Sequence, residues 1–180
     1  MKKSGFTLAE VLIAMGIIGV VAAMILPTFV MNGRQQANDA KFSSSIADLE
    51  NAFGTMITKE VVDGFSETKF GKDKTAKEID TDGNEDYVLK SYIKTSGDGT
   101  TLASMYGGSA SFKQNKCKDN LAITPTIIFG LKNGSYYIVT DSSGNGYIDV
   151  NGRNKPNCLN KDLYQVTLDE NGLFTRKGEE

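Results

Sequence analysis

One carboxylate interrupts the long apolar segment near the start of the chain. Lys2 and Lys3 precede an apolar run from Phe6 to about Met31, in which Glu10 is the one acidic residue. A run of about 26 residues, at roughly 1.5 Å each, is long enough to cross a hydrocarbon layer of roughly 30 Å. A carboxylate inside it costs roughly 2.5–3.5 kcal/mol on membrane-insertion scales, so Glu10 requires a partner.

The residues around this carboxylate form a pattern. The stretch Gly5-Phe6-Thr7-Leu8-Ala9-Glu10, followed by Val11-Leu12-Ile13-Ala14, resembles the cleavage and methylation segment of type IV pilins and pseudopilins. The resemblance covers about residues 1–35 and is diffuse beyond them. It implies that a prepilin peptidase cuts after Gly5, that Phe6 is then N-methylated, and that Glu10 takes part in methylation and assembly.

Pairing between copies would account for the buried charge. Cleavage after Gly5 would free an α-amino group on Phe6, and Glu10 lies about one helical turn further along. Within one chain the side chain is too constrained to cap that amine well. In a bundle of staggered copies, Glu10 of one copy can meet the Phe6 ammonium of its neighbour, which removes the cost of burying either charge alone.

Two other interpretations of the segment remain open. It could be a cleaved secretory signal, with Val20 and Ala22 as the small residues before a conventional site, or a plain signal anchor in which Glu10 borders the interface. The apolar character continues to Val30, and an acid within the apolar region of a signal peptide is unusual. These two features favour the pilin-like interpretation.

Composition argues against an enzyme. The 180 residues carry a formal net charge of −2, so no basic footprint indicates nucleic acid. Histidine is absent, which removes the commonest general base and metal ligand. The sequence shows no glycine-rich phosphate loop, nucleophile elbow or CxxC motif. We therefore expect no enzymatic activity and no required cofactor.

The two cysteines, Cys117 and Cys158, are expected to form a disulfide if the body of the chain lies outside the cytoplasm. Closing a loop of about 40 residues would contribute roughly 3–4 kcal/mol in the chain-entropy model. The alternative is two free thiols in a reducing setting.

A second polar stretch has the spacing of a calcium loop. In residues 141–149, oxygen donors occupy positions one, three, five and nine of the loop pattern, with glycine at six. The candidate ligands are Asp141, Ser143, Asn145 and Asp149. Position twelve is glycine instead of the bidentate glutamate, so a calcium site would be weak or completed by Asn151 or Asp162. The alternative is that these residues make a tight turn between strands.

A helix with one apolar stripe should continue beyond the membrane segment. We expect it to run through Pro27, because proline in a membrane helix kinks more often than it terminates. Together with Gly19, Pro27 could bound a stretch that loosens during packing, or both could be ordinary helix residues. Beyond Arg34, apolar residues recur at helical spacing: Phe42, Ile46, Leu49, Phe53 and Ile57.

The C-terminal third has the pattern of an antiparallel sheet that covers this stripe. Strands are predicted at 126–131, 136–139, 147–150, 163–168 and 173–175, with Asn-Gly turns in the first and last hairpins. Before them, a short helix is predicted from about Asn84 to Gly97. The fold class is therefore α+β and pilin-like: a long N-terminal membrane helix, amphipathic in its distal half, packed on a sheet of about four strands.

These features together predict a structural subunit of a type IV pilus or type II secretion pseudopilus. The expected parts are a leader (1–5), a transmembrane and assembly helix (6–31), its amphipathic continuation (32–60) and an extracytoplasmic globular domain (61–180). The chain would cross the inner membrane once, with its N-terminus cytoplasmic, and then enter an extracytoplasmic filament. The resemblance implies as partners other subunits, the prepilin peptidase and methyltransferase, and the inner-membrane assembly machinery. The alternative is a monomeric, membrane-anchored binding domain, stabilised by calcium.

Overall fold

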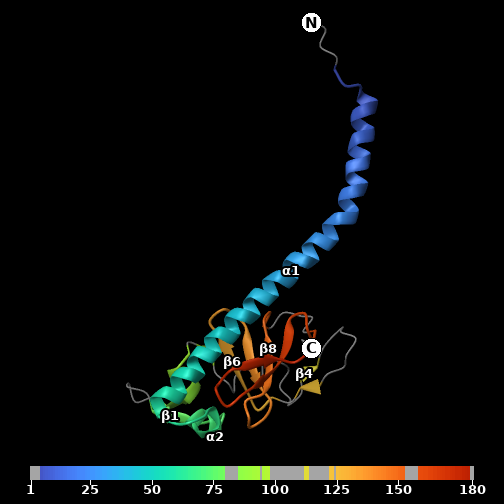
Figure 1. The fold of residues 1–180 in the computed structure, drawn as a ribbon. Helices are drawn as coiled ribbons and strands as arrows, with labels where there is room; N and C mark the ends of the chain where they lie inside the picture. Colours follow the sequence, from blue (N-terminus) through green and yellow to red (C-terminus); the bar gives the residue numbers. More distant parts are fainter. Residues whose placement is uncertain are drawn as a thin grey trace. The chain divides into compact units, whose positions relative to one another are not determined.

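The computed structural model describes residues 5–79, 85–93, 95–97, 112–113, 122–123, 125–152 and 158–178. The chain divides into two compact units, Met1–Ala37 and Asn38–Glu180. Helix α1 supplies most of the first unit, and its distal part belongs to the second (Figure 1).

The helical elements are α1 (Leu8–Glu60), the 3₁₀ helix η1 (Phe65–Glu67), α2 (Lys69–Lys72) and the 3₁₀ helix η2 (Val88–Ser91). The strands before the C-terminal third are β1 (Lys77–Ile79), β2 (Glu85–Tyr87), β3 (Thr95–Gly97), β4 (Phe112–Lys113) and β5 (Ala122–Ile123). Those of the C-terminal third are β6 (Ile127–Leu131), β7 (Tyr136–Val139), β8 (Gly146–Asp149), β9 (Leu163–Leu168) and β10 (Phe174–Arg176).

Helix α1 is long because no strong stop signal lies within it. Pro27 falls inside the helix, as expected, since proline removes one backbone hydrogen bond and the remaining bonds and side chains continue the helix on both sides. The helix ends just before Val61, which has a left-handed backbone with φ 52°. The amide of Val62 then donates to the carbonyl of Ile57 at 3.3 Å, which closes the last turn.

The main sheet has the order β10-β9-β8-β7-β6-β3, and each neighbouring pair is antiparallel. Strands β6 to β10 follow one another in sequence order, which is a simple meander. The predicted α+β fold is confirmed, with five strands from the C-terminal third. The sixth strand, β3, comes from the middle of the chain, where a helix was expected.

Both predicted Asn-Gly hairpins form, and their turns share one geometry. Between β6 and β7, the amide of Gly134 donates to Leu131 O at 3.0 Å, and between β9 and β10 that of Gly172 donates to Asp169 O at 3.1 Å. Each glycine has a positive φ, 83° and 79°, whereas the asparagine before it does not. Only the glycine of each Asn-Gly pair therefore takes the left-handed conformation.

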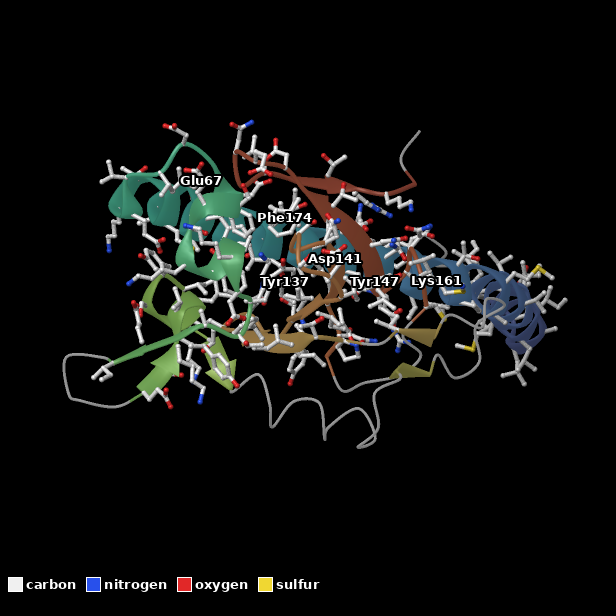
Figure 2. The ribbon with its side chains drawn as sticks, turned by 90° about the horizontal axis from the view of Figure 1, so that it is seen from below. Glu67, Tyr137, Asp141, Tyr147, Lys161 and Phe174 are labelled. Carbon is white, nitrogen blue, oxygen red and sulfur yellow. The ribbon has the colours of Figure 1, made fainter. Side chains whose placement is uncertain are left out.

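The apolar stripe of α1 packs on one face of the sheet, as predicted. Leu49 and Phe53 are fully buried, and Phe42, Ile46 and Ile57 are partly buried against the same core. Phe53 lies at the centre of an aromatic cluster, with ring centroids 4.7 Å from Phe65, 5.8 Å from Phe70, 6.3 Å from Tyr137 and 5.6 Å from Phe174. Figure 2 shows Tyr137 and Phe174 near the middle of this layer, and their centroids are 5.6 Å apart.

The opposite face of the sheet buries a second, smaller cluster. Side chains at alternate strand positions point there, as the two-residue period of a strand requires. Its buried members are Ile123, Ile128, Ile138, Tyr147 and Leu163. The sheet is therefore buried on both faces, which explains why β6 and β8 are buried at every position.

The short helix predicted from about Asn84 to Gly97 is wrong. Residues 85–87 form β2 against β1, with Tyr87 opposite Lys77, and residues 88–91 form a single 3₁₀ turn. Asn84 itself lies outside the described residues. Val88 and Leu89 are buried in the main core, so tertiary packing fixes this segment where local periodicity was too short to do so.

Candidate functional site

The start of α1 is built by a reciprocal pair of side chains. Thr7 is the residue before the helix, and its Oγ1 accepts a hydrogen bond from the Glu10 amide at 3.3 Å. Oε2 of Glu10 accepts in return from the Thr7 amide at 2.8 Å and from the Thr7 hydroxyl at 2.7 Å. This arrangement is a capping box, which satisfies backbone amides that a helix leaves without internal partners.

The peptide bond expected to be cleaved lies just outside this cap. Gly5 and Phe6 precede α1, and Phe6 is 89% exposed. A Cβ added to Gly5 would meet no atom within 4 Å. Because the capping box starts the helix at Leu8, the bond between Gly5 and Phe6 is neither helical nor covered in this chain.

Sequence reasoning missed Thr7. The sequence interpretation gave Glu10 a part in methylation, in assembly and in pairing with the Phe6 amine, but none in capping. Thr7-Leu8-Ala9-Glu10 nevertheless has the Thr-x-x-Glu spacing of a capping box. The geometry adds a partner for Glu10 within its own chain. It does not replace pairing between chains, which a single copy cannot display.

The apolar part of α1 leaves its side chains uncovered. By length and composition this helix could cross a membrane. Ile13 is 64% exposed, Ile17 60%, Met24 73% and Phe29 75%. An apolar surface of this extent on a single chain indicates a membrane or a protein partner that covers it.

The candidate calcium ligands separate into two places. Asp141 caps the turn between β7 and β8: its Oδ1 accepts from the amides of Ser143 at 2.9 Å and Asn145 at 3.0 Å, and its Oδ2 from the Asn145 side chain at 2.9 Å. The Asn145 Oδ1 in turn accepts from the Leu168 amide at 2.9 Å. These are the contacts of the tight turn that was the alternative expectation.

Asp149 lies at the other end of β8, opposite Tyr136 on β7. Its side chain is fully buried, and Oδ1 accepts from the amides of Asn151 at 3.2 Å and Gly152 at 3.0 Å. Asn151 donates to Asp162 at 2.6 Å, so the two residues considered for completing a calcium site lie with Asp149 and not with Asp141. Within the described ranges, no three His, Cys, Asp or Glu side chains are grouped to hold a metal. Calcium binding itself stays a prediction.

The expected disulfide also stays a prediction, because Cys117 lies outside the described residues. Cys158 is buried, with 8% of its surface exposed, and its amide donates to Oδ1 of Asp162. It lies next to the short parallel bridge between Leu159 and Leu163 that leads into β9.

Comparison with known proteins agrees with the geometry of the N-terminal segment. Residues 1–26 match the family model of the prokaryotic N-terminal methylation motif. The chain is 39% identical over 51 residues to the type II secretion system core protein G of Aeromonas hydrophila, which is 28% of this chain and 35% of that protein. It is 41% identical over 51 residues to the protein of the same name from Escherichia coli (strain K12), 28% of this chain and 34% of that one.

The chain thus spans about a third of the length of the relatives it matches. No solved structure matches it. The motif matches residues 1–26. In the structure this segment contains the capped start of α1, and a sheet follows the long apolar helix. Over its N-terminal segment the chain is therefore similar to the prokaryotic N-terminal methylation motif and to the type II secretion system core protein G.

Proposed function

We propose that this chain is a filament subunit of a type IV pilus or type II secretion pseudopilus. It is made as a precursor in the inner membrane with its N-terminus in the cytoplasm, cut after Gly5 and N-methylated at Phe6. The observation that carries the proposal is the exposed Gly5–Phe6 bond placed directly before a capped, uncovered apolar helix. The match of residues 1–26 to the methylation motif supports it.

Assembly moves the apolar half of α1 from the bilayer into the centre of a bundle of copies. The exposed residues between Phe6 and Met31 are covered by lipid before assembly and by neighbouring helices afterwards. The sheet domain forms the outer wall of the filament. Its partners are other pilin or pseudopilin subunits, the peptidase and methyltransferase, and the assembly machinery of the inner membrane.

Glu10 can serve its own chain and a neighbour together. In the described part of the chain, both hydrogen bonds to its carboxylate use Oε2, so Oε1 is open to a second donor. We assign that second donor to the Phe6 ammonium of an adjacent copy. The intact capping box then holds the carboxylate in position while the ion pair between copies sets their stagger.

Two substitutions at Glu10 separate capping from charge pairing. Glu10→Gln keeps a side chain that can complete a capping box but has no charge, and Glu10→Ala removes both. We expect both variants to be cleaved but not to enter filaments, as measured from sheared filament fractions. Normal incorporation of Glu10→Gln would show that the cap is sufficient and that no ion pair between copies is needed.

The first test is the N-terminal mass of the protein extracted from membranes of cells that carry its own processing enzymes. A chain that begins at N-methylated Phe6 supports the proposal. An intact Met1 or Lys2 favours the monomeric anchored domain, and a terminus near Ala23 indicates an exported protein. Ser4→Ala, a change next to the bond, is the matched control for a Gly5 substitution that blocks cleavage.

A further inference from the structure

A lysine lies inside the aromatic core of the second unit. Lys74 follows α2 and is only 4% exposed. Its Nζ donates to the carbonyl of Gly71 at 2.6 Å and lies 4.8 Å and 5.4 Å from the ring centroids of Phe65 and Phe70. Lysine is almost never buried to this extent unless a carboxylate pairs with it directly. The ion pairs of the described residues do not include Lys74.

The charged groups that face this amine come from three places. Asp73 precedes it in the chain, Asp141 lies in the turn between β7 and β8, and Glu170 lies in the turn between β9 and β10. The groups that touch it from η1 and α2 are aromatic rings and a carbonyl. Hydrogen bonds from Thr75 hold the pKa of Asp73 below its usual value, and those from Ser66 do the same for Glu170, so both stay ionised at neutral pH.

Burial outweighs the attraction of these carboxylates. It lowers the pKa of Lys74 from 10.5 to about 8, although Asp141, Asp73 and Glu170 each act to raise it. The amine therefore changes its charge in mildly alkaline solution while an exposed lysine would still be protonated. Release of the segment into water would restore the usual affinity for the proton.

The segment that carries Lys74 packs against two turns of the sheet. A Cβ added to Gly144 would lie 3.4 Å from Cε of Lys74 and 3.4 Å from Cε1 of Phe65, so the lysine stem fills the space beside the β7–β8 turn. The amide of Phe65 donates to Glu170 O at 2.7 Å, and the amide of Ser66 to Oε2 of Glu170 at 3.1 Å. If residues 65–79 separate from these two turns, all of these contacts are lost at once.

We propose that Lys74 is a proton-controlled latch that holds residues 65–79 on the β7–β8 and β9–β10 turns, and that the latch tightens when the amine loses its proton. The inference does not depend on the proposed filament function. It concerns only how the second unit stays closed.

The direction follows from proton linkage. Since the folded state binds the proton less tightly than the unfolded state, the unfolded chain carries more protons between about pH 8 and pH 10.5. Stability must then rise with pH across that window. Below it both states are protonated and above it both are neutral, so the difference is constant outside the window.

The test is chemical denaturation of the full chain in detergent, followed by tyrosine fluorescence because tryptophan is absent. Between about pH 7.5 and pH 9.5 the unfolding constant of the wild type should fall on the order of tenfold. Lys74→Met keeps the length of the side chain without the charge and should show no such fall. Lys74→Arg keeps a permanent charge, so it should be less stable than the wild type and equally independent of pH in this window.

Equal pH profiles for the wild type and Lys74→Met would overturn the latch. If either variant fails to fold, NMR titration of the lysine ε-carbons in the wild type tests whether Lys74 has a lowered pKa. One resonance with a midpoint near pH 8, among others near pH 10.5, supports the latch. A single group of resonances that all titrate near pH 10.5 refutes it.

Discussion

The two units of the chain treat similar apolar side chains in opposite ways. In the first unit Ile17 is 60% exposed and Phe29 75%, whereas in the second unit Leu49 and Phe53 are fully buried. All four lie on the same helix. The second unit covers its part of the helix with a sheet, whereas the first unit leaves these side chains exposed. The contrast separates a part that stabilises the folded domain from a part that, on the proposed function, takes part in assembly.

Truncation of a core residue should have the largest effect on stability, and it tests the contrast in burial between the two units. Phe53→Ala removes a ring that contacts four other aromatic rings, and a buried Phe→Ala change costs about 3–5 kcal/mol. We expect the second unit to lose most of its stability in denaturant titrations.

Ile17→Ala is the matched control on the exposed half of α1. It should leave the denaturation midpoint unchanged and reduce membrane retention or filament yield instead. A similar loss of stability from Ile17→Ala would mean that the first unit contributes to folding of the second.

The proposed disulfide would strengthen the second unit alone. If Cys117 and Cys158 are bonded, Cys158→Ser should cost roughly 3–4 kcal/mol, because a loop of about 40 residues becomes free in the unfolded chain. Cys117→Ser should give the same loss. The intact mass of the unreduced protein and its reaction with iodoacetamide provide the direct measurement, and alkylation of both cysteines without reduction would contradict the bond.

The spacing of apolar residues predicted the elements in which that spacing repeats several times. The stripe from Phe42 to Ile57 repeats often enough to identify a buried helix face, and the strands at 136–139 and 163–168 have the predicted bounds. The Thr7 cap could also be predicted from the sequence, because the Thr-x-x-Glu spacing lies within four consecutive residues. The charge of Glu10 by itself indicates a partner in another chain and gives no sign of the cap.

Features that depend on distant segments could not be predicted in this way. Tyr87 pairs with Lys77 only because β1 returns beside β2, and burial of Lys74 requires turns that lie about 70 and 100 residues further along. The calcium pattern does not fix where its candidate ligands lie. It assumes a compact loop, whereas residues 146–149 are extended in β8 and carry Asp149 away from Asp141.

A smaller effect should decide between a turn and a calcium site at Asp141. Asp141→Ala removes three hydrogen bonds that close the β7–β8 turn and should cost about 1–2 kcal/mol. If the turn is the whole role of this residue, the loss is equal with millimolar calcium and with a chelator. Ser142→Ala, an exposed neighbour, is the control. A calcium-dependent rise in melting temperature that Asp141→Ala abolishes would establish the metal site.

The smallest expected effect is a gain in stability at the end of α1, where the helix is closed very differently from its start. Thr7 and Glu10 cap the beginning with side chains, but the last turn is closed through Val61, a β-branched residue in a left-handed conformation with φ 52° and 88% of its surface exposed. Left-handed backbone costs such a residue roughly 1–2 kcal/mol, and glycine adopts it freely. Val61→Gly should therefore raise the free energy of unfolding of the second unit by about 1 kcal/mol. Val62→Gly, which adds flexibility at a position without positive φ, should lower it. If Val61→Gly is instead destabilising, the exposed valine must contribute contacts in the folded chain that outweigh its strain, and the second unit would extend its packing beyond the end of α1.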